Sequence, residues 1–109
     1  MSTTDVATID WTGASGRTYK YWIYRLPPNF EAKPGNYVFA REVSPGRWAP
    51  VYIGETSDLS ERFDAHHKAE CIRRNGATHI HAHLNNQGKV ARQAEEADLI
   101  ARWNPSCNG

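Results

Sequence analysis

The chain has 109 residues, which is enough for one hydrophobic core and too few for two domains of ordinary size. Its apolar fraction of 39% is typical of a globular protein, and no apolar run approaches the length that spans a bilayer. Thirteen Lys and Arg against twelve Asp and Glu leave a net charge of +1, which excludes the strongly basic surface of many duplex-binding domains. A polyanionic partner would therefore have to bind at a local basic patch.

The N-terminal segment MSTTDVATID has neither the basic flank nor the apolar core of a signal peptide, so we expect a cytoplasmic protein. Cys71 and Cys107 are far apart in the sequence and form no CxxC pair. A metal knuckle or a disulfide framework is therefore not indicated, and we expect both cysteines to be reduced, structural thiols.

The N-terminal third has the residue types of a β-hairpin. Residues 7–26 are rich in β-branched and aromatic side chains, and turn-forming residues occupy positions 13–16 in the middle. The segment 27–35 contains three prolines, which predict an irregular loop.

Two further strand-like runs, 36–43 and 47–55, flank the turn residues Ser44, Pro45 and Gly46 and predict a second hairpin. Pro50 indicates that the returning strand starts irregularly or at a sheet edge.

Helical signals follow in the second half of the chain. Asp58 and Glu61 have the spacing of a capping box, which predicts a helix from Asp58 to about Asn75–Gly76. Residues 78–84 alternate and predict a strand, and the alanine-rich run 89–103 predicts a second helix that Pro105 stops. The order ββ-ββ-α-β-α is typical of an α+β domain built on an antiparallel sheet.

Several polar side chains are expected to converge on one face of this sheet. If the second hairpin turns tightly, Tyr37 and Tyr52 share a face, whereas a bulge would break that parity. The predicted first helix adds a stripe of Arg62, His66 and Arg73. Each residue alone is more often a core tyrosine or a solvated helix residue, but together they indicate a site.

Six short motifs occur in order along residues 35–109, and together they resemble the GIY-YIG nucleases. The resemblance implies a nuclease domain over 35–109, a three-stranded antiparallel sheet flanked by helices. Residues 1–34 would be an added N-terminal β-hairpin and loop packed on the same domain. The motifs are Gly35–Tyr37, Tyr52–Gly54, Arg62, His66, the E-x-x-L-I run Glu96–Ile100 and NPSCN at Asn104–Asn108.

The resemblance also implies a reaction, the hydrolysis of phosphodiester bonds in DNA by an endonuclease with one divalent ion, Mg²⁺ or Mn²⁺, and no small-molecule cofactor. Tyr52 would be the general base or its relay, and Tyr37 would help to position water. Arg62 and His66 would contact the phosphate, and Glu96 would hold the metal. Phosphodiester hydrolysis requires an aligned water, neutralised phosphoryl oxygens and a hard cation, which suits these residue types.

The choice of general base stays open among Tyr52, Tyr37 and His66. Glu55 stands where some members of the family have a lysine, and a carboxylate there cannot lower the pKa of a phenol as a cation would. Arg62 and the metal would then have to activate Tyr52 or its water. Asn108 is expected to close the site, and Arg73 to contact substrate.

Helical periodicity separates the two adjacent glutamates of the second predicted helix. Glu96 falls between Ile100 and Trp103 on the apolar stripe, which predicts that it points inward. Glu95 falls about 100° away on the arc expected to face water. A partnership of Glu96 with Arg92 would make it structural and would remove the metal ligand.

The N-terminal hairpin has aromatic residues interleaved with cations, among them Lys20 and Trp22. Such surfaces stack unpaired bases, which suggests substrate contacts to single-stranded or locally opened DNA. Packing of these aromatics as strand residues is an equally physical interpretation and slightly the better one.

His79, His81 and His83 share one face of a predicted strand, a spacing that can bind zinc or copper. No Cys or carboxylate in the segment completes a ligand set, so a half-exposed strand with these histidines facing outward is the simpler interpretation.

A non-catalytic nucleic-acid-binding module with the same fold is the alternative function. Glu96 favours the enzyme, because a carboxylate without a metal would repel bound phosphate.

Overall fold

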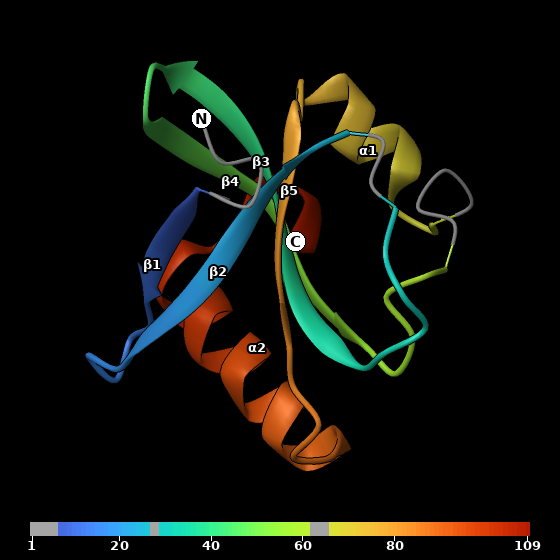
Figure 1. Cartoon of the computed structure of the whole chain (residues 1–109). Coiled ribbons are helices and arrows are strands. Elements are labelled where there is room, and N and C mark those ends of the chain that lie inside the picture. Colours follow the sequence, from blue (N-terminus) through green and yellow to red (C-terminus); the bar gives the residue numbers. More distant parts are fainter. Residues whose placement is uncertain (1–6, 27–28, 62–65) are drawn as a thin grey trace.

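The computed structural model describes residues 7–26, 29–61 and 66–109. In these residues five strands form one curled antiparallel sheet in the order β1-β2-β5-β3-β4 (Figure 1). The fold is therefore α+β, as the sequence predicts. The elements are β1 (Thr8–Thr12), β2 (Thr18–Arg25), β3 (Gly35–Ser44), β4 (Arg47–Thr56), α1 (Ala69–Arg74), β5 (His79–Leu84), α2 (Lys89–Trp103) and the short 3₁₀ helix η2 (Ser106–Asn108).

Both predicted hairpins are present. β1 and β2 are joined through a turn that contains Gly16 at φ 88°, and β3 and β4 through a turn that contains Gly46 at φ 76°. A positive φ favours glycine, because other residues pay a steric cost there. The helix α2 has the predicted bounds, and its C-cap Asn104 adopts the left-handed conformation immediately before Pro105.

The N-terminal hairpin belongs to the same sheet. β2 pairs with β5, so β3, β4 and β5 form three adjacent strands that the hairpin extends on one side. Its turn is held to α2, because the backbone N–H and the hydroxyl of Ser15 donate to the Asp98 carboxylate at 2.8 and 2.7 Å. The indole of Trp103 donates to the Thr12 carbonyl at 2.9 Å.

The β3–β4 pairing contains two irregularities that cancel. Glu42 faces Trp48 and Ser44 faces Arg47, which leaves Val43 as an extra residue on β3. Phe39 then faces Tyr52 while Ala40 faces Pro50, which leaves one extra residue on β4. Because the second shift reverses the first, odd positions of β3 again lie opposite even positions of β4.

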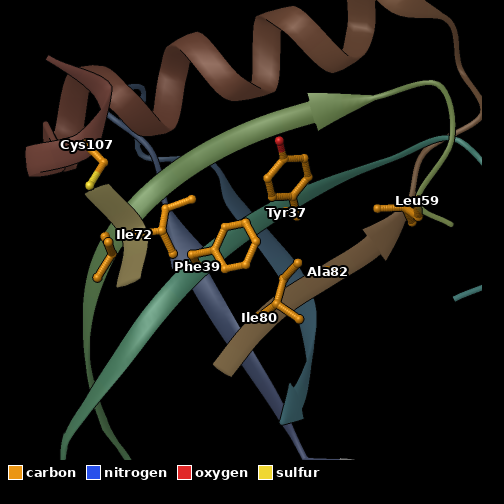
Figure 2. Close-up of a cluster of buried hydrophobic side chains, with 8 residues drawn as sticks. Tyr37, Phe39, Leu59, Ile72, Ile80, Ala82 and Cys107 are labelled. Atoms are coloured by element: carbon orange, nitrogen blue, oxygen red, sulfur yellow. The ribbon is translucent and has the colours of Figure 1, made fainter. Parts of the chain in front are cut away.

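Each face of the sheet carries its own hydrophobic cluster. On one face, residues of β3 and β5 pack with Leu59, Ile72 of α1 and Cys107 of η2 (Figure 2). On the other face, Trp11, Tyr21, Val38 and Ile53 pack under Leu99 of α2. The alternation of β3 between these clusters explains why residues 35–40 are all buried.

The first helix starts later than the capping-box signal predicts. The Asp58 carboxylate accepts hydrogen bonds from the backbone N–H and hydroxyl of Ser60, a local turn in place of a helix cap. The helix α1 begins at Ala69, and its end at Arg74, before Asn75 and Gly76, is as predicted.

As a consequence, His66 precedes α1 and does not share a helical stripe with Arg73. Arg62, the expected phosphate contact, lies outside the described residues.

The expectation of two reduced thiols is wrong for this structure. Cys71 of α1 and Cys107 of η2 form a disulfide with a Cα–Cα distance of 5.9 Å. Their sequence separation of 36 residues gave no indication of this contact. The sheet brings the two elements together on one face.

The expectation of outward histidines on β5 is also wrong. His79 and His81 are buried, and the ring of Trp48 packs against both at centroid distances of 4.8 and 4.6 Å. Ile80 and Ala82 pack in the cluster on one face of β5, and Trp48 covers His79 and His81 on the other, so both faces of the strand are covered.

No helix within the described ranges combines the length and the hydropathy that a bilayer crossing requires.

Candidate active site

Tyr37 and Tyr52 lie on the same face of the sheet, as the parity of the hairpin predicts. Their ring centroids are 6.2 Å apart. The Tyr37 ring lies across Gly54, where a Cβ atom would come within 2.6 Å of the phenol oxygen. Glycine at position 54 is therefore required for this placement of Tyr37, which explains the last residue of the Tyr52–Gly54 motif.

His66 reaches this pair from the segment before α1. Its Nε2 lies 2.8 Å from the Tyr37 hydroxyl oxygen, and its Nδ1 accepts a hydrogen bond from the backbone N–H of Lys68 at 3.0 Å. Burial is the main cause of a lowered pKa of His66, followed by the neighbouring His67. In the neutral ring Nδ1 is the acceptor, so Nε2 carries the proton and donates to Tyr37.

The environment keeps both phenols protonated. Burial raises the pKa of Tyr37, and the negative charges that Tyr52 and Glu96 can carry raise it further. Burial and Glu96 likewise raise the pKa of Tyr52. In the protein alone these hydroxyls act as hydrogen-bond donors, and a nearby cation would be needed before either became a base.

Glu96 approaches the tyrosines from α2. It is half-buried, and its pKa is raised by burial and by the Glu55 carboxylate, while a hydrogen bond from the Glu55 backbone N–H acts in the opposite direction. The guanidinium of Arg92 pairs with Glu55, with Nε 3.3 Å from the carboxylate oxygen. Arg92 is therefore not the ion-pair partner that would have made Glu96 structural.

These residues fit a divalent ion only in a limited sense. Within the described ranges no group of three or more His, Cys, Asp or Glu side chains is placed to hold a metal. Mg²⁺ commonly binds through one or two carboxylates and completes its shell with water and substrate phosphate oxygens. The half-buried carboxylate of Glu96 can supply one such ligand, whereas Glu55 is paired with Arg92.

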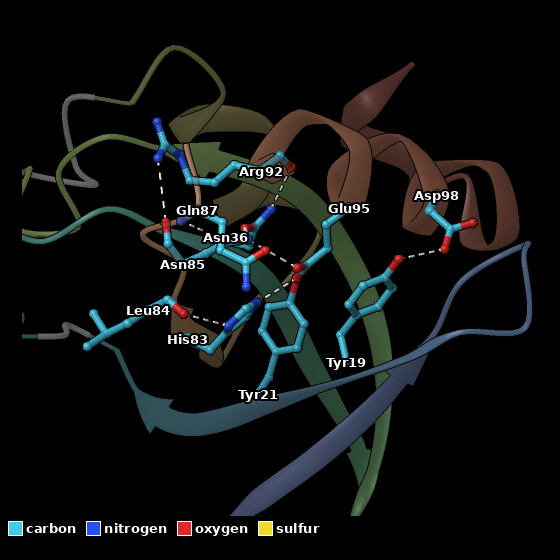
Figure 3. A network of polar contacts seen from close by, with 10 residues as sticks. All are labelled: Tyr19, Tyr21, Asn36, His83, Leu84, Asn85, Gln87, Arg92, Glu95 and Asp98. Carbon is cyan, nitrogen blue, oxygen red and sulfur yellow. Dashed lines mark hydrogen bonds and ion pairs between the residues drawn. The ribbon is translucent and has the colours of Figure 1, made fainter. Parts of the chain in front are cut away.

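The orientation that the helical wheel predicts for Glu95 is wrong. Glu95, expected to face water, is buried and accepts hydrogen bonds at 2.6 Å from the Tyr21 hydroxyl and from Nε2 of His83 (Figure 3). Polar side chains on the sheet beneath α2 satisfy a buried carboxylate, and residue hydrophobicity alone does not reveal them.

The other predicted site residues do not join the tyrosine cluster directly. The Asn108 side chain binds both backbone groups of Ile53, each at 2.8 Å, so its amide fastens η2 to β4. Arg73 is exposed on α1. Lys20 and Trp22 lie on β2 and line a groove between β2 and β5.

Sequence reasoning missed one neighbour of the cluster. His67 stacks on His66 with ring centroids 4.4 Å apart and also lies 6.1 Å from the Tyr52 ring. The adjacent pair of histidines in the sequence was the available signal.

Comparison with known proteins finds no match among protein-family models, curated proteins or solved structures.

Proposed function

We propose that the protein is a metal-dependent endonuclease that hydrolyses phosphodiester bonds in DNA, as the resemblance to the GIY-YIG nucleases implies. The observation that carries the proposal is the hydrogen bond of 2.8 Å between Tyr37 and His66, beside Tyr52 and within the electrostatic reach of Glu96. Four separate segments contribute these residues: β3, β4, the segment before α1, and α2. In addition, β3, which carries Tyr37, lies between β4 and β5, an arrangement compatible with a three-stranded nuclease sheet over residues 35–109.

The side chains suggest a division of roles in which donors face the phosphate. Hydrolysis joins a water oxygen to phosphorus and breaks the bond to the leaving oxygen, while negative charge stays on the phosphoryl oxygens. The Tyr52 and Tyr37 hydroxyls, in chain with His66, can donate to those oxygens or align the water. Glu96 would hold the divalent ion, which when bound would acidify a water or neutralise the leaving oxygen.

A non-catalytic nucleic-acid-binding module is the second candidate, and one observation favours it. The raised pKa values of Tyr37 and Tyr52 leave both phenols as donors, which can hold a phosphate without attacking it. The two functions share the binding surface and differ in the need for Glu96.

Labelled DNA incubated with the protein in EDTA, Mg²⁺ or Mn²⁺ tests the proposal. We expect cleavage only with a metal, and its loss in Glu96→Gln. Glu70→Gln is the matched control, because Glu70 is an exposed carboxylate on α1 whose ion pair with Arg74 is also exposed. Binding of DNA without cleavage in any metal would establish the module instead of the enzyme.

A further inference from the structure

A groove opens on the surface where β2 and β5 stop pairing with each other. β2 and β5 pair only from Trp22 to Arg25 and from His79 to Ala82. The start of β2 continues along β1 alone, and the end of β5 continues along β3 alone. A groove of about 1400 Å³ occupies the opening between them.

The polar side chains at the floor of this groove bind one another. The Glu95 carboxylate joins Tyr21 of β2 to His83 of β5, and the Tyr21 and His83 rings meet edge-on at 4.7 Å (Figure 3). Asn85 adds a hydrogen bond to Asn36 at 3.0 Å. These side chains bridge the strands where backbone pairing has stopped, so the opening is a built feature of the fold.

One wall of the groove has the composition of a base-stacking surface. Lys20, Trp22 and Tyr24 occupy alternate positions of β2 and therefore share a face. Trp22 is 39% exposed, although tryptophan is usually among the most buried side chains, and Lys20 is exposed beside it. Exposed side-chain amides of Asn86 and Gln87 line the opposite side.

Charges of both signs line the groove near the start of β2, namely those of Asp98, Arg17 and Lys20. At one end Asp98 accepts hydrogen bonds from Ser15 and from the Tyr19 hydroxyl, and these contacts lower the pKa of its carboxyl. The ionised carboxylate disfavours a phosphate there. A nucleotide strand would place its phosphate at Lys20, whose side chain leaves β2 on the face opposite to that of Tyr19, the residue that binds Asp98.

We propose that this groove binds an unpaired base of single-stranded DNA, with the indole of Trp22 stacked on the base and the ammonium of Lys20 on the adjacent phosphate. The proposal deepens the proposed function and rests on it for the identity of the nucleic acid. A stack on an aromatic ring accepts any base and does not require a basic surface overall, which agrees with a net charge of +1. A continuous duplex presents its base edges and not its base faces, so it cannot use the Trp22 ring in this way.

The groove lies close enough to the candidate active site to serve the same strand. Leu59 lines the groove and also packs in the cluster that contains Tyr37. Trp22 of β2 pairs with Ala82 of β5, and Ala82 pairs with Tyr37 of β3, so two strand spacings, about 10 Å, separate the Trp22 and Tyr37 backbones. A segment anchored at Trp22 could therefore extend across the sheet towards Tyr37 and Tyr52.

The test measures binding in EDTA, so that cleavage does not intervene. The probe is a twelve-residue oligothymidylate with one central 2-aminopurine, whose fluorescence falls when it stacks on an aromatic ring, used alone or annealed to its complement. We expect the wild type to quench and bind the single strand, and Trp22→Ala to weaken that binding about tenfold or more. Trp22→Phe should restore part of it, and Lys20→Ala should weaken binding mainly at low salt.

Matched controls are available on other surfaces. Val43→Ala changes another exposed apolar strand residue, and Lys33→Ala another exposed lysine, both outside the groove lining. Both should bind as the wild type does, and the melting temperature of each variant checks folding. Equal binding by Trp22→Ala and the wild type, equal affinity for the duplex, or tighter binding of an oligouridylate would overturn the proposal.

A separate cleavage assay distinguishes the two proposals. If the wild type binds DNA through Trp22 but cuts no DNA, the groove proposal is supported and the nuclease proposal is contradicted. If the wild type cleaves DNA with a metal but Trp22→Ala binds as well as the wild type, the nuclease proposal is supported and the groove proposal is contradicted.

Discussion

Glu95 and Glu96 are consecutive residues of α2 that enter two different environments. Glu95 is buried between Tyr21 and His83, whereas Glu96 is half-buried near Glu55 and the two candidate catalytic tyrosines. Each glutamate therefore supports a different property, one the stability of the fold and the other the proposed chemistry.

Exchange of each carboxylate for an amide should separate these properties. Tyr21 and His83 both donate to Oε2 of Glu95, so in Glu95→Gln the neutral amide oxygen replaces the charged acceptor and the N–H₂ group faces the Asn85 donor. This exchange should lower the free energy of unfolding by about 1–3 kcal/mol. The melting temperature should then fall by roughly 5–15 °C. Glu96→Gln should retain the wild-type melting temperature or exceed it, because it removes repulsion by Glu55. It should also lose metal-dependent cleavage, because it removes the proposed metal ligand. Thermal unfolding of the two variants together checks this. A wild-type melting temperature for Glu95→Gln would mean that its buried contacts contribute nothing.

Tyr37→Phe removes the hydroxyl that accepts the hydrogen bond from His66 Nε2 and retains the ring. Packing against Phe39 and Tyr52 is preserved, so we expect a loss of only about 1 kcal/mol of stability. Cleavage should fall on the order of 10²-fold if this donor faces the phosphate. Initial rates on one labelled substrate provide the measurement.

Tyr21→Phe is the control for that experiment, since Tyr21 is a fully buried tyrosine in the cluster on the other face of the sheet, where its hydroxyl donates to Glu95. Normal cleavage by Tyr37→Phe would leave Tyr52 or His66 as the residue that matters.

The stability of the protein should fall as the pH drops from about 6.5 towards 4. His81 is fully buried, its Nδ1 accepts from the Trp11 indole, and its Nε2 has no hydrogen-bond partner within the described residues. Burial lowers the pKa of His81 to about 4. The unfolded chain, with a pKa near ~6.5, binds this proton first, so acid favours unfolding. The free energy of unfolding keeps its full value above the unfolded pKa of His81 and falls by on the order of 3 kcal/mol once the pH is below its folded pKa.

The variant His81→Gln tests this titration, because glutamine can still accept from Trp11 and does not ionise. Melting temperatures between pH 4 and pH 7 should vary less for His81→Gln than for the wild type. Two profiles with the same slope would assign the acid sensitivity to other groups, such as His66 with its lowered pKa or Asp98 at still lower pH.

The disulfide should stabilise the C-terminal end of the chain. Closing a loop with a sequence separation of 36 residues removes conformational entropy from the unfolded chain, which raises the free energy of that state by about 4 kcal/mol at 25 °C. Reductant, or the pair Cys71→Ser and Cys107→Ser, should therefore lower the melting temperature by 10 °C or more. The doubly substituted protein should not respond to reductant. A thiol titration that finds two free cysteines in the unreduced protein would contradict the bond.

Asn108 separates a structural from a substrate role at the same end of the chain. Its amide binds both backbone groups of Ile53, so Asn108→Ala should lower the melting temperature by roughly 5–15 °C. Substrate affinity should change little at temperatures where the variant is folded. A raised KM with an unchanged melting temperature would instead support the substrate contact that the sequence suggested for Asn108.

Local sequence signals were sufficient to define most of the elements. Alternation, turn residues and proline define both hairpins, the strand β5 and the bounds of α2, because these features depend on neighbouring residues. The shared face of Tyr37 and Tyr52 could also be predicted, although two bulges had to cancel for the prediction to be correct.

Tertiary structure alone decided which polar groups are buried and with which partners. The disulfide, the inward histidines of β5 and the burial of Glu95 each depend on residues 12 to 74 positions away in the sequence. A helical wheel ranks residues by hydrophobicity and cannot detect that Tyr21 and His83 lie beneath α2. Because a buried carboxylate is stable wherever donors satisfy it, the position of Glu95 was set by the sheet and not by the helix that carries it.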